Sequence, residues 1–482
     1  MQIRTHGTRA AARNRKVIGY PDLDCAPVRT PNSTARDGLL DDCRPGIFRN
    51  LVCYLRSWFA LLLLSAPAFG AEALLGPQVR PDYLEEAASL RALPQVQAAM
   101  DHILELEPQS LADLIELTEI PAPPFGEQQR AARFAEMLRE AGLTDVVIDE
   151  VGNAIGRRPG SVGNRVIGYS AHLDTVFPEE TDVTVRFEGN RLLAPGIGDN
   201  SRGLVSVITA LRALQHAGIQ TEADLLFIGN VGEEGLGDLR GIKHLFREGA
   251  PAIDSLIVVD GGDTSRIVYG GVGSYRYRVT FEGPGGHSWG AFGMANPHHA
   301  IGRAIALFDE AAALVTSEGA RTSYNIGRIG GGTSINAIPF ESWMEVDMRS
   351  GDTSKLDEID GVFHNAMQIA LEQENSGRQE GPELTLSVDR VGTRPAALGD
   401  PSSPLLQRAM AVTLEFGTEP ELRISSTDAN LPISLGIPAV TISRGGRGGN
   451  AHSPDEWWEN EDGHIGIQIG LLTLLMEAGL AD

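Results

Sequence analysis

Hydrophobic positions along the chain alternate between helix-like and strand-like spacing. The stretch 127–141 keeps its apolar residues on one side, with charges between them, and ends before Gly142, which predicts an amphipathic helix. Apolar runs of strand length recur at 166–171, 225–229 and 255–259, and a helix-patterned stretch, 204–216, separates the first two. Strands that alternate with helices predict an α/β sheet, whose ligands lie beyond the carboxyl ends of its strands.

From about residue 272 the pattern changes and predicts a second, α+β unit. Its expected elements are a strand at 275–281, a long Ala-rich helix at 298–314, and strands at 324–329 and 343–348. This unit ends near Arg390, and a helix at 404–416 with a buried strand at 437–442 then rejoins the first sheet. We therefore expect a catalytic domain in two parts, 71–271 and 391–482, interrupted by an inserted domain at 272–390.

The first seventy residues form a separate leader. They carry ten Lys/Arg and five Asp/Glu, and a short apolar run at 58–66 follows Arg56 and precedes the small residues Ala68 and Gly70. This layout is typical of a secretory signal, with cleavage near Gly70/Ala71. The run is shorter than the ~20 residues of a spanning helix, although an uncleaved anchor is the alternative. Residues 1–50 exceed a normal signal, so we expect an over-extended start.

Composition narrows the function classes. A length of 482 residues predicts more than one domain, and 42% hydrophobic with 22% charged residues excludes wholesale disorder. The net charge of −24 disfavours nucleic acid as a partner. All three cysteines, Cys25, Cys43 and Cys53, lie in the leader, so a mature chain has neither a catalytic thiol nor cysteine-ligated zinc.

Histidines and carboxylates follow the apolar runs. They are His172 and Asp174 after 166–171, Asp199 after a Gly-rich turn, Glu233 and Glu234 after 225–229, Asp260 after 255–259, and His452 after a glycine loop. Singly, each has an ordinary explanation, such as a turn histidine, a helix N-cap or a solvated acid. Together they supply N/O ligands for two divalent metals. An acid shared by both metals would hold them roughly 3.5–4 Å apart, which suits activation of a water and predicts hydrolysis.

The order of these residues resembles a known family. It is similar to the co-catalytic zinc family of peptidase T, carboxypeptidase G, carnosinase-type dipeptidases, aminoacylase and acetylornithine deacetylase, over roughly residues 100–482. The resemblance implies an α/β zinc-peptidase domain with a central, mostly parallel sheet, interrupted by an inserted α+β lid and dimerisation domain. The implied roles are His172 and Asp260 on one zinc, Glu234 and His452 on the other, Asp199 bridging both, Glu233 as general base, and Asp174 orienting His172.

The inserted domain contributes three further candidates. His287, in Gly285-Gly-His-Ser, resembles a histidine that reaches across a homodimer to steady the developing oxyanion, whereas a lone histidine of this kind is otherwise a core or turn residue. Asn336 and Arg349 resemble substrate-holding positions, and an Arg is the expected clamp for a peptide carboxylate. For Arg349 the alternative is an ion pair with Asp347 or Glu345.

The predicted function is hydrolysis of amide bonds in short peptides. Asp at position 260 and the stretches around Asp238 and Asp428 resemble the aminopeptidase and dipeptidase or tripeptidase side of the family. An N-acyl-amino-acid deacylase is the alternative, and a non-catalytic binding protein is a remote one. The expected cofactors are two divalent ions, Zn²⁺ with Mn²⁺ or Co²⁺ as alternatives. We expect an exported, periplasmic or secreted homodimer with no stable membrane insertion.

Overall fold

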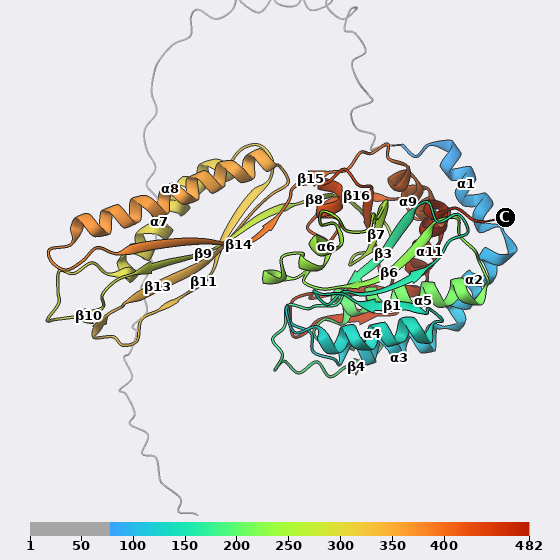
Figure 1. Cartoon of the computed structure of the whole chain (residues 1–482), viewed down its shortest axis with the longest axis horizontal. Helices are drawn as coiled ribbons and strands as arrows, with labels where there is room; N and C mark the ends of the chain where they lie inside the picture. Colours follow the sequence, from blue (N-terminus) through green and yellow to red (C-terminus); the bar gives the residue numbers. More distant parts are fainter. Residues whose placement is uncertain (1–77, 482) are drawn as a thin grey trace, which may run out of the picture. The chain divides into compact units, whose positions relative to one another are not determined.

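The computed structural model describes residues 78–481 (Figure 1). The predicted leader and its cleavage site lie outside these residues. Within them, none of the helices combines the length and apolar character needed to cross a bilayer.

A nine-stranded mixed sheet organises most of the described chain. Its order is β1-β2-β6-β3-β7-β17-β8-β15, with β16 also paired to β8. The strands are β1 (Asp145–Ile148), β2 (Ala154–Arg158), β3 (Val166–His172), β6 (Asp224–Asn230), β7 (Ser255–Val259), β8 (Arg266–Gly271), β15 (Ala397–Leu398), β16 (Glu421–Ser425) and β17 (Ala439–Ile442). The central strands β6, β3, β7 and β17 run parallel, and antiparallel pairs lie toward both edges. The predicted α/β class is confirmed.

Helices cover both faces of this sheet, which explains why its central strands are almost continuously apolar. The helices are α1 (Pro81–Arg91), α2 (Pro94–Glu105), α3 (Glu107–Thr118), α4 (Gln128–Glu140), α5 (Arg202–His216), α6 (Arg240–Leu245), α9 (Pro404–Glu415), α10 (Asn430–Ser434) and α11 (Gly463–Ala478). On β3, Ile167 and Tyr169 join the large core that includes α4, α5 and α11. On β7, Leu256 and Val258 face the smaller core that includes α6 and α10. The expected helices at 127–141, 204–216 and 404–416 are present.

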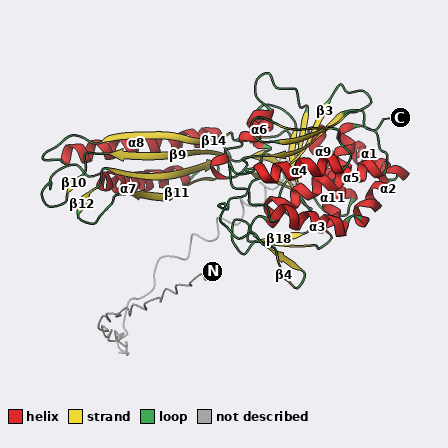
Figure 2. Ribbon diagram, turned by 60° about the horizontal axis from the view of Figure 1, so that its bottom comes forward, coloured by secondary structure: helices red, strands yellow, loops and turns green. Residues whose placement is uncertain are grey.

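Residues 273–394, which we call the inserted segment, contain a second sheet. Its antiparallel order is β11-β13-β9-β14, from β9 (Gly273–Glu282), β11 (Thr322–Gly331), β13 (Glu341–Ser350) and β14 (Thr385–Arg394). The helices α7 (Pro297–Thr316) and α8 (Thr353–Gly377) run along this sheet, as Figure 2 shows, and share a core with it. A two-stranded pair, β10 (Gly286–His287) and β12 (Ala337–Ile338), belongs to the same segment.

A small antiparallel sheet supports the loop that carries His452. Its order is β18-β19-β5-β4, from β4 (Arg186–Glu188), β5 (Arg191–Leu193), β18 (Arg447–Gly449) and β19 (Trp457–Glu459). The loop between β18 and β19 is therefore held at both ends.

Helix α11 packs against the loop at Gly445 and against β3 through its own glycines. A Cβ at Gly466 would overlap the Gly445 backbone, and one at Gly470 would overlap the Tyr169 hydroxyl. The glycines in this otherwise apolar helix therefore permit close backbone approach.

We predict opposite effects for two glycine-to-alanine changes in helices. Gly466→Ala should lower the free energy of unfolding by about 1–3 kcal/mol, because the backbone of Gly445 cannot yield to the added methyl. Gly302→Ala on α7, where no atom lies within 4 Å of the added Cβ, should raise it by up to about 1 kcal/mol. Denaturant melts of both variants measure this, and a stabilised Gly466→Ala protein would contradict the packing described.

Candidate metal centre

The predicted ligands meet at the carboxyl edge of the central sheet. His172 is the last residue of β3, Glu234 follows β6 and Asp260 follows β7. Because β6, β3 and β7 are adjacent and parallel, their carboxyl ends lie at one edge. Asp199 lies in the turn before α5, and His452 in the loop after β18.

Two three-residue groups that could each hold a metal ion share Asp199. The ligand atoms of His172, Asp199 and Asp260 lie within 4.8 Å of one another, and so do those of Asp199, Glu234 and His452. His172 Nε2 is 3.1 Å from Asp199 Oδ1, and His452 Nε2 is 3.2 Å from Asp199 Oδ2 and 2.8 Å from Glu234 Oε1. The structure thus brings together all five predicted ligands, and we call them the metal cluster.

Glu233 and Asp174 border the metal cluster. Glu233 offers a carboxylate oxygen within 4.8 Å of ligand atoms of His172 and Glu234. Asp174 is fully buried, and its two carboxylate oxygens accept hydrogen bonds from the backbone N–H groups of Glu233 (3.0 Å) and Glu234 (2.7 Å). Its backbone carbonyl oxygen lies 3.0 Å from His172 Nδ1, so Asp174 positions both the histidine and the paired glutamates.

The electrostatics of this edge indicate a need for added positive charge. Hydrogen bonds to Asp199 and Glu234 raise the pKa of His452 to about 10. Burial opposes the charged form of His172, yet its hydrogen bonds to Asp174 and Asp199 hold its pKa well above the ordinary value. Burial also raises the pKa of Asp260, with Asp199 adding to the effect. The carboxylates therefore create an excess of negative charge at this edge. Imidazole and carboxylate donors in such surroundings fit borderline divalent cations, which would replace the protons on the histidines.

Arg394, the last residue of β14, contacts Glu233, and the sequence analysis did not identify this contact. Its buried guanidinium donates from Nη1 to Glu233 Oε1 (2.7 Å) and to Ser426 Oγ (2.9 Å), and Nη2 contacts the Glu233 carbonyl oxygen. Burial raises the pKa of Glu233 well above its usual value, and the charge of Arg394 opposes that rise. An arginine at a strand end has no local signature, so only the fold could have shown this pair.

Glu456 fixes the turn that carries Asp199. Its buried carboxylate accepts hydrogen bonds from the backbone N–H groups of Gly196 (2.9 Å), Gly198 (2.8 Å) and Asp199 (2.7 Å). The segment after His452 drew attention in the sequence for its histidine alone. Only the fold brings Glu456 to a turn more than 250 positions away.

Asp428 is also buried close to the cluster. It accepts a hydrogen bond from Asn230 Nδ2 at 2.7 Å, and burial raises its pKa to about 7. In the sequence it stood out only as part of a stretch similar to peptidase T.

Of the three candidates in the inserted segment, His287 is the one that could ligate a metal, and it belongs to none of the metal-ligand groups found among the described residues. His287 and Asn336 are exposed neighbours, since β10 pairs with β12 and Ser288 N–H donates to the Asn336 carbonyl oxygen at 3.0 Å. Arg349 Nε donates to Asp347 Oδ2 at 2.6 Å, which is one of the two alternatives expected for it.

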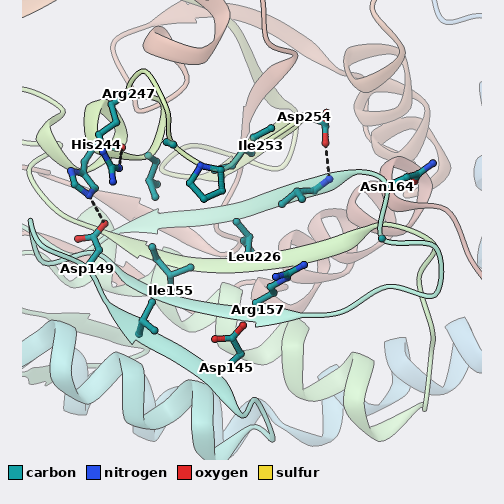
Figure 3. A pocket seen from close by; sticks show the side chains of 17 residues that line it. Asp145, Asp149, Ile155, Arg157, Asn164, Leu226, His244, Arg247, Ile253 and Asp254 are labelled. Carbon is teal, nitrogen blue, oxygen red and sulfur yellow. Dashed lines mark hydrogen bonds and ion pairs between the residues drawn. The ribbon is translucent and has the colours of Figure 1, made fainter.

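A cavity of about 520 Å³ lies at the other end of β3 (Figure 3). Its lining includes Val166, the first residue of β3, and no member of the metal cluster. Several of its charged side chains have partners: Asp254 accepts from Val166 N–H at 2.7 Å, and His244 lies 3.8 Å from Asp149. The metal cluster is therefore the candidate site because of its ligand side chains, although the cavity of Figure 3 lies elsewhere.

Comparison with known proteins defines the class. The model of Peptidase family M20/M25/M40 matches residues 168–476, and the chain belongs to this family. It is a hydrolase of the peptidase and amidohydrolase type, and two metal ions are typical of the family.

Individual relatives are distant. The chain is 26% identical over 347 residues to succinyl-diaminopimelate desuccinylase of Corynebacterium glutamicum, covering 70% of this chain and 89% of that protein. Aminopeptidase PepT from Bacillus cereus aligns with a TM-score of 0.58 at 21% identity, covering 76% of this chain and 98% of that one. Human carnosine dipeptidase 1 aligns with a TM-score of 0.62 at 13% identity, covering 80% and 99%. These two structures support the fold.

We predict that Arg394 and Glu233 are strongly coupled. Arg394→Met should lower the free energy of unfolding by about 3–5 kcal/mol, because it leaves the buried Glu233 carboxylate without its cation. The same change in a Glu233→Gln background should cost much less, since no charge is then stranded. A double-mutant cycle by denaturant unfolding measures the difference, and additive effects would show that the pair is uncoupled.

Proposed function

We propose that this protein is a di-zinc hydrolase of amide bonds in short peptides, acting as an aminopeptidase or as a dipeptidase or tripeptidase. The observation that carries the proposal is the pair of ligand groups that share Asp199. One carboxylate common to two three-residue groups provides for two adjacent ions, whereas a single-ion site needs no such sharing.

In this proposal each zinc has two ligands of its own in addition to Asp199. His172 and Asp260 hold one ion, and Glu234 and His452 hold the other. When bound, the two ions polarise the scissile carbonyl and bring the pKa of water toward neutrality. Zn²⁺ suits the mixed nitrogen and oxygen donors best, with Mn²⁺ and Co²⁺ as alternatives.

Glu233 is the proposed general base. Its carboxylate borders both ligand groups without being needed by either, so it is available to take a proton from the attacking water and pass it to the leaving nitrogen. Arg394 holds one of its carboxylate oxygens, and Asp174 holds its backbone N–H. The first contact restrains the side chain of Glu233, and the second fixes its backbone.

The inserted segment completes the proposed site through a homodimer. His287 is exposed and lies outside the cluster of its own chain, which suits a histidine that serves the active site of the partner subunit and stabilises a developing oxyanion there. Asn336, beside it, is a proposed substrate contact. Arg349 would have to leave Asp347 before it could hold a substrate carboxylate.

The second candidate function is deacylation of N-acyl amino acids. It is consistent with the similarity to succinyl-diaminopimelate desuccinylase, a deacylase by name, which aligns over 70% of this chain. The same metal cluster serves either reaction, because both reactions hydrolyse an amide.

Export after cleavage near Gly70/Ala71 is a further part of the proposal.

We predict that Glu233→Gln retains both metal ions and lowers turnover by at least about 100-fold, the usual scale for loss of a general base. Elemental analysis of the purified protein, together with initial rates, measures the two effects. Glu248→Gln, the same change at an exposed position, is the control. Retained turnover in the Glu233 variant would remove its assignment as base.

We also predict chelator-sensitive release of the first residue from free di- and tripeptides. Product analysis by mass spectrometry should include amino-blocked peptides and N-acetyl amino acids. Cleavage confined to N-acyl substrates would favour the deacylase instead. An absence of metal-dependent turnover on every substrate would leave a binding protein as the explanation.

A further inference from the structure

The guanidinium of Arg444 lies in a space that three glycines leave open. A Cβ at Gly198 or Gly448 would approach Arg444 Nη2 to 2.9 or 2.7 Å, and one at Gly261 would approach Nη1 to 3.1 Å. These glycines come from three separate segments: the turn before α5, the turn after β7, and β18. The surroundings thus provide room for this one side chain.

Arg266, the first residue of β8, reaches the same place. The Cβ that would meet Arg444 at Gly261 would also lie 3.2 Å from Arg266 Nη1. Gly261 directly follows the predicted ligand Asp260 and has a φ of 46°, a conformation that disfavours a side chain. Two guanidinium groups from separate segments therefore lie close together over Gly261, next to the predicted ligand Asp260.

Both arginines differ from others that are comparably enclosed. Arg240 pairs with Glu127 at 2.6 Å and Arg276 pairs with Asp347 at 2.9 Å. Arg266 and Arg444 are half-buried, yet in the part of the chain that the structure describes neither side chain forms an ion pair or a hydrogen bond with a protein acceptor. Partly desolvated guanidinium groups without acceptors favour an anionic ligand.

We propose that Arg266 and Arg444 form a carboxylate-binding subsite for the substrate beside the metal cluster. The inference rests on the proposed function, and it narrows the substrate to an amide that carries a carboxylate. Guanidinium groups match the planar geometry of a carboxylate and stay charged at every physiological pH. The carboxylate comes either from the free end of a short peptide or from a dicarboxylic acyl group or side chain.

A simpler role for the two arginines is to offset the charge of Asp260. Burial raises the pKa of Asp260, and the charges of Arg266 and Arg444 act in the opposite direction. This role predicts loss of metal on substitution, with no preference among ligands. The subsite predicts a preference for a second carboxylate, so the two roles give different results.

The first experiment measures binding to the metal-loaded protein by calorimetry, with succinate and butyrate as probes. The two share a four-carbon chain, and only succinate has a second carboxylate. We expect succinate to bind about tenfold or more tightly than butyrate, as expected for hydrogen bonds to a charged group. Arg266→Gln and Arg444→Gln should each bring that ratio toward one, whereas Arg186→Gln, an exposed arginine on β4, should keep it.

The metal content of each variant is measured alongside binding. If Arg444→Gln proves unstable, Arg444→Lys replaces it, because lysine keeps the positive charge and loses the planar guanidinium. An unchanged succinate-to-butyrate ratio in Arg266→Gln and Arg444→Lys would overturn the subsite. Equal weakening of both probes together with loss of metal would also overturn it and establish charge compensation of Asp260. Because this experiment needs no turnover, a failure of the proposed hydrolysis would not affect its result.

The second experiment identifies the source of the carboxylate. Initial rates on Ala-Ala and Ala-Ala amide test the free end of a peptide, and rates on N-succinyl and N-acetyl alanine amide test an acyl carboxylate. The pair that uses the subsite should show a KM about tenfold or more lower for the carboxylate-bearing member, and Arg444→Gln should abolish that difference. If Arg444→Gln slows both members of each pair equally, the subsite is refuted.

Discussion

The concentration of carboxylates at one edge of the central sheet is the constraint on which this structure depends. Asp199, Glu234 and Asp260 place ligand atoms within 4.8 Å of a neighbouring ligand, and two unit charges at ~4 Å repel by about 4 kcal/mol at an effective dielectric constant of 20. Packing alone would not assemble such a group. The parallel strands β6, β3 and β7 bring the acids together, and the histidines and cations beside them offset the repulsion.

Two buried carboxylates position the ligand-bearing turns by accepting hydrogen bonds from the backbone. Asp174 accepts from the N–H groups of Glu233 and Glu234, and Glu456 accepts from three N–H groups in the turn that carries Asp199. These acids need not bind metal in order to matter. Each satisfies backbone donors of a loop, so the predicted ligand side chains extend from backbone positions that hydrogen bonds hold in place.

The sequence predicted the parts of the fold that are encoded locally. The apolar runs at 166–171, 225–229 and 255–259 became β3, β6 and β7, because strands covered on both faces must be continuously hydrophobic. The edge strand β1 is short and largely exposed, so no such signal marks it. Arg394 and Arg444 escaped detection for a different reason: their significance lies in contacts with residues far away in the sequence, which only the folded chain brings together.

Arg394 also links the inserted segment to the candidate base. β14 ends at Arg394, and the preceding residue, Thr393, donates from its N–H to Asp238 Oδ1 (2.8 Å) and accepts from Lys243 Nζ (2.9 Å). These contacts attach the end of β14 to the region after β6, which also carries Glu233. A change in the direction of β14 would therefore move the guanidinium that holds the Glu233 carboxylate. The position of the candidate base and that of the inserted segment are thus physically connected through one buried ion pair.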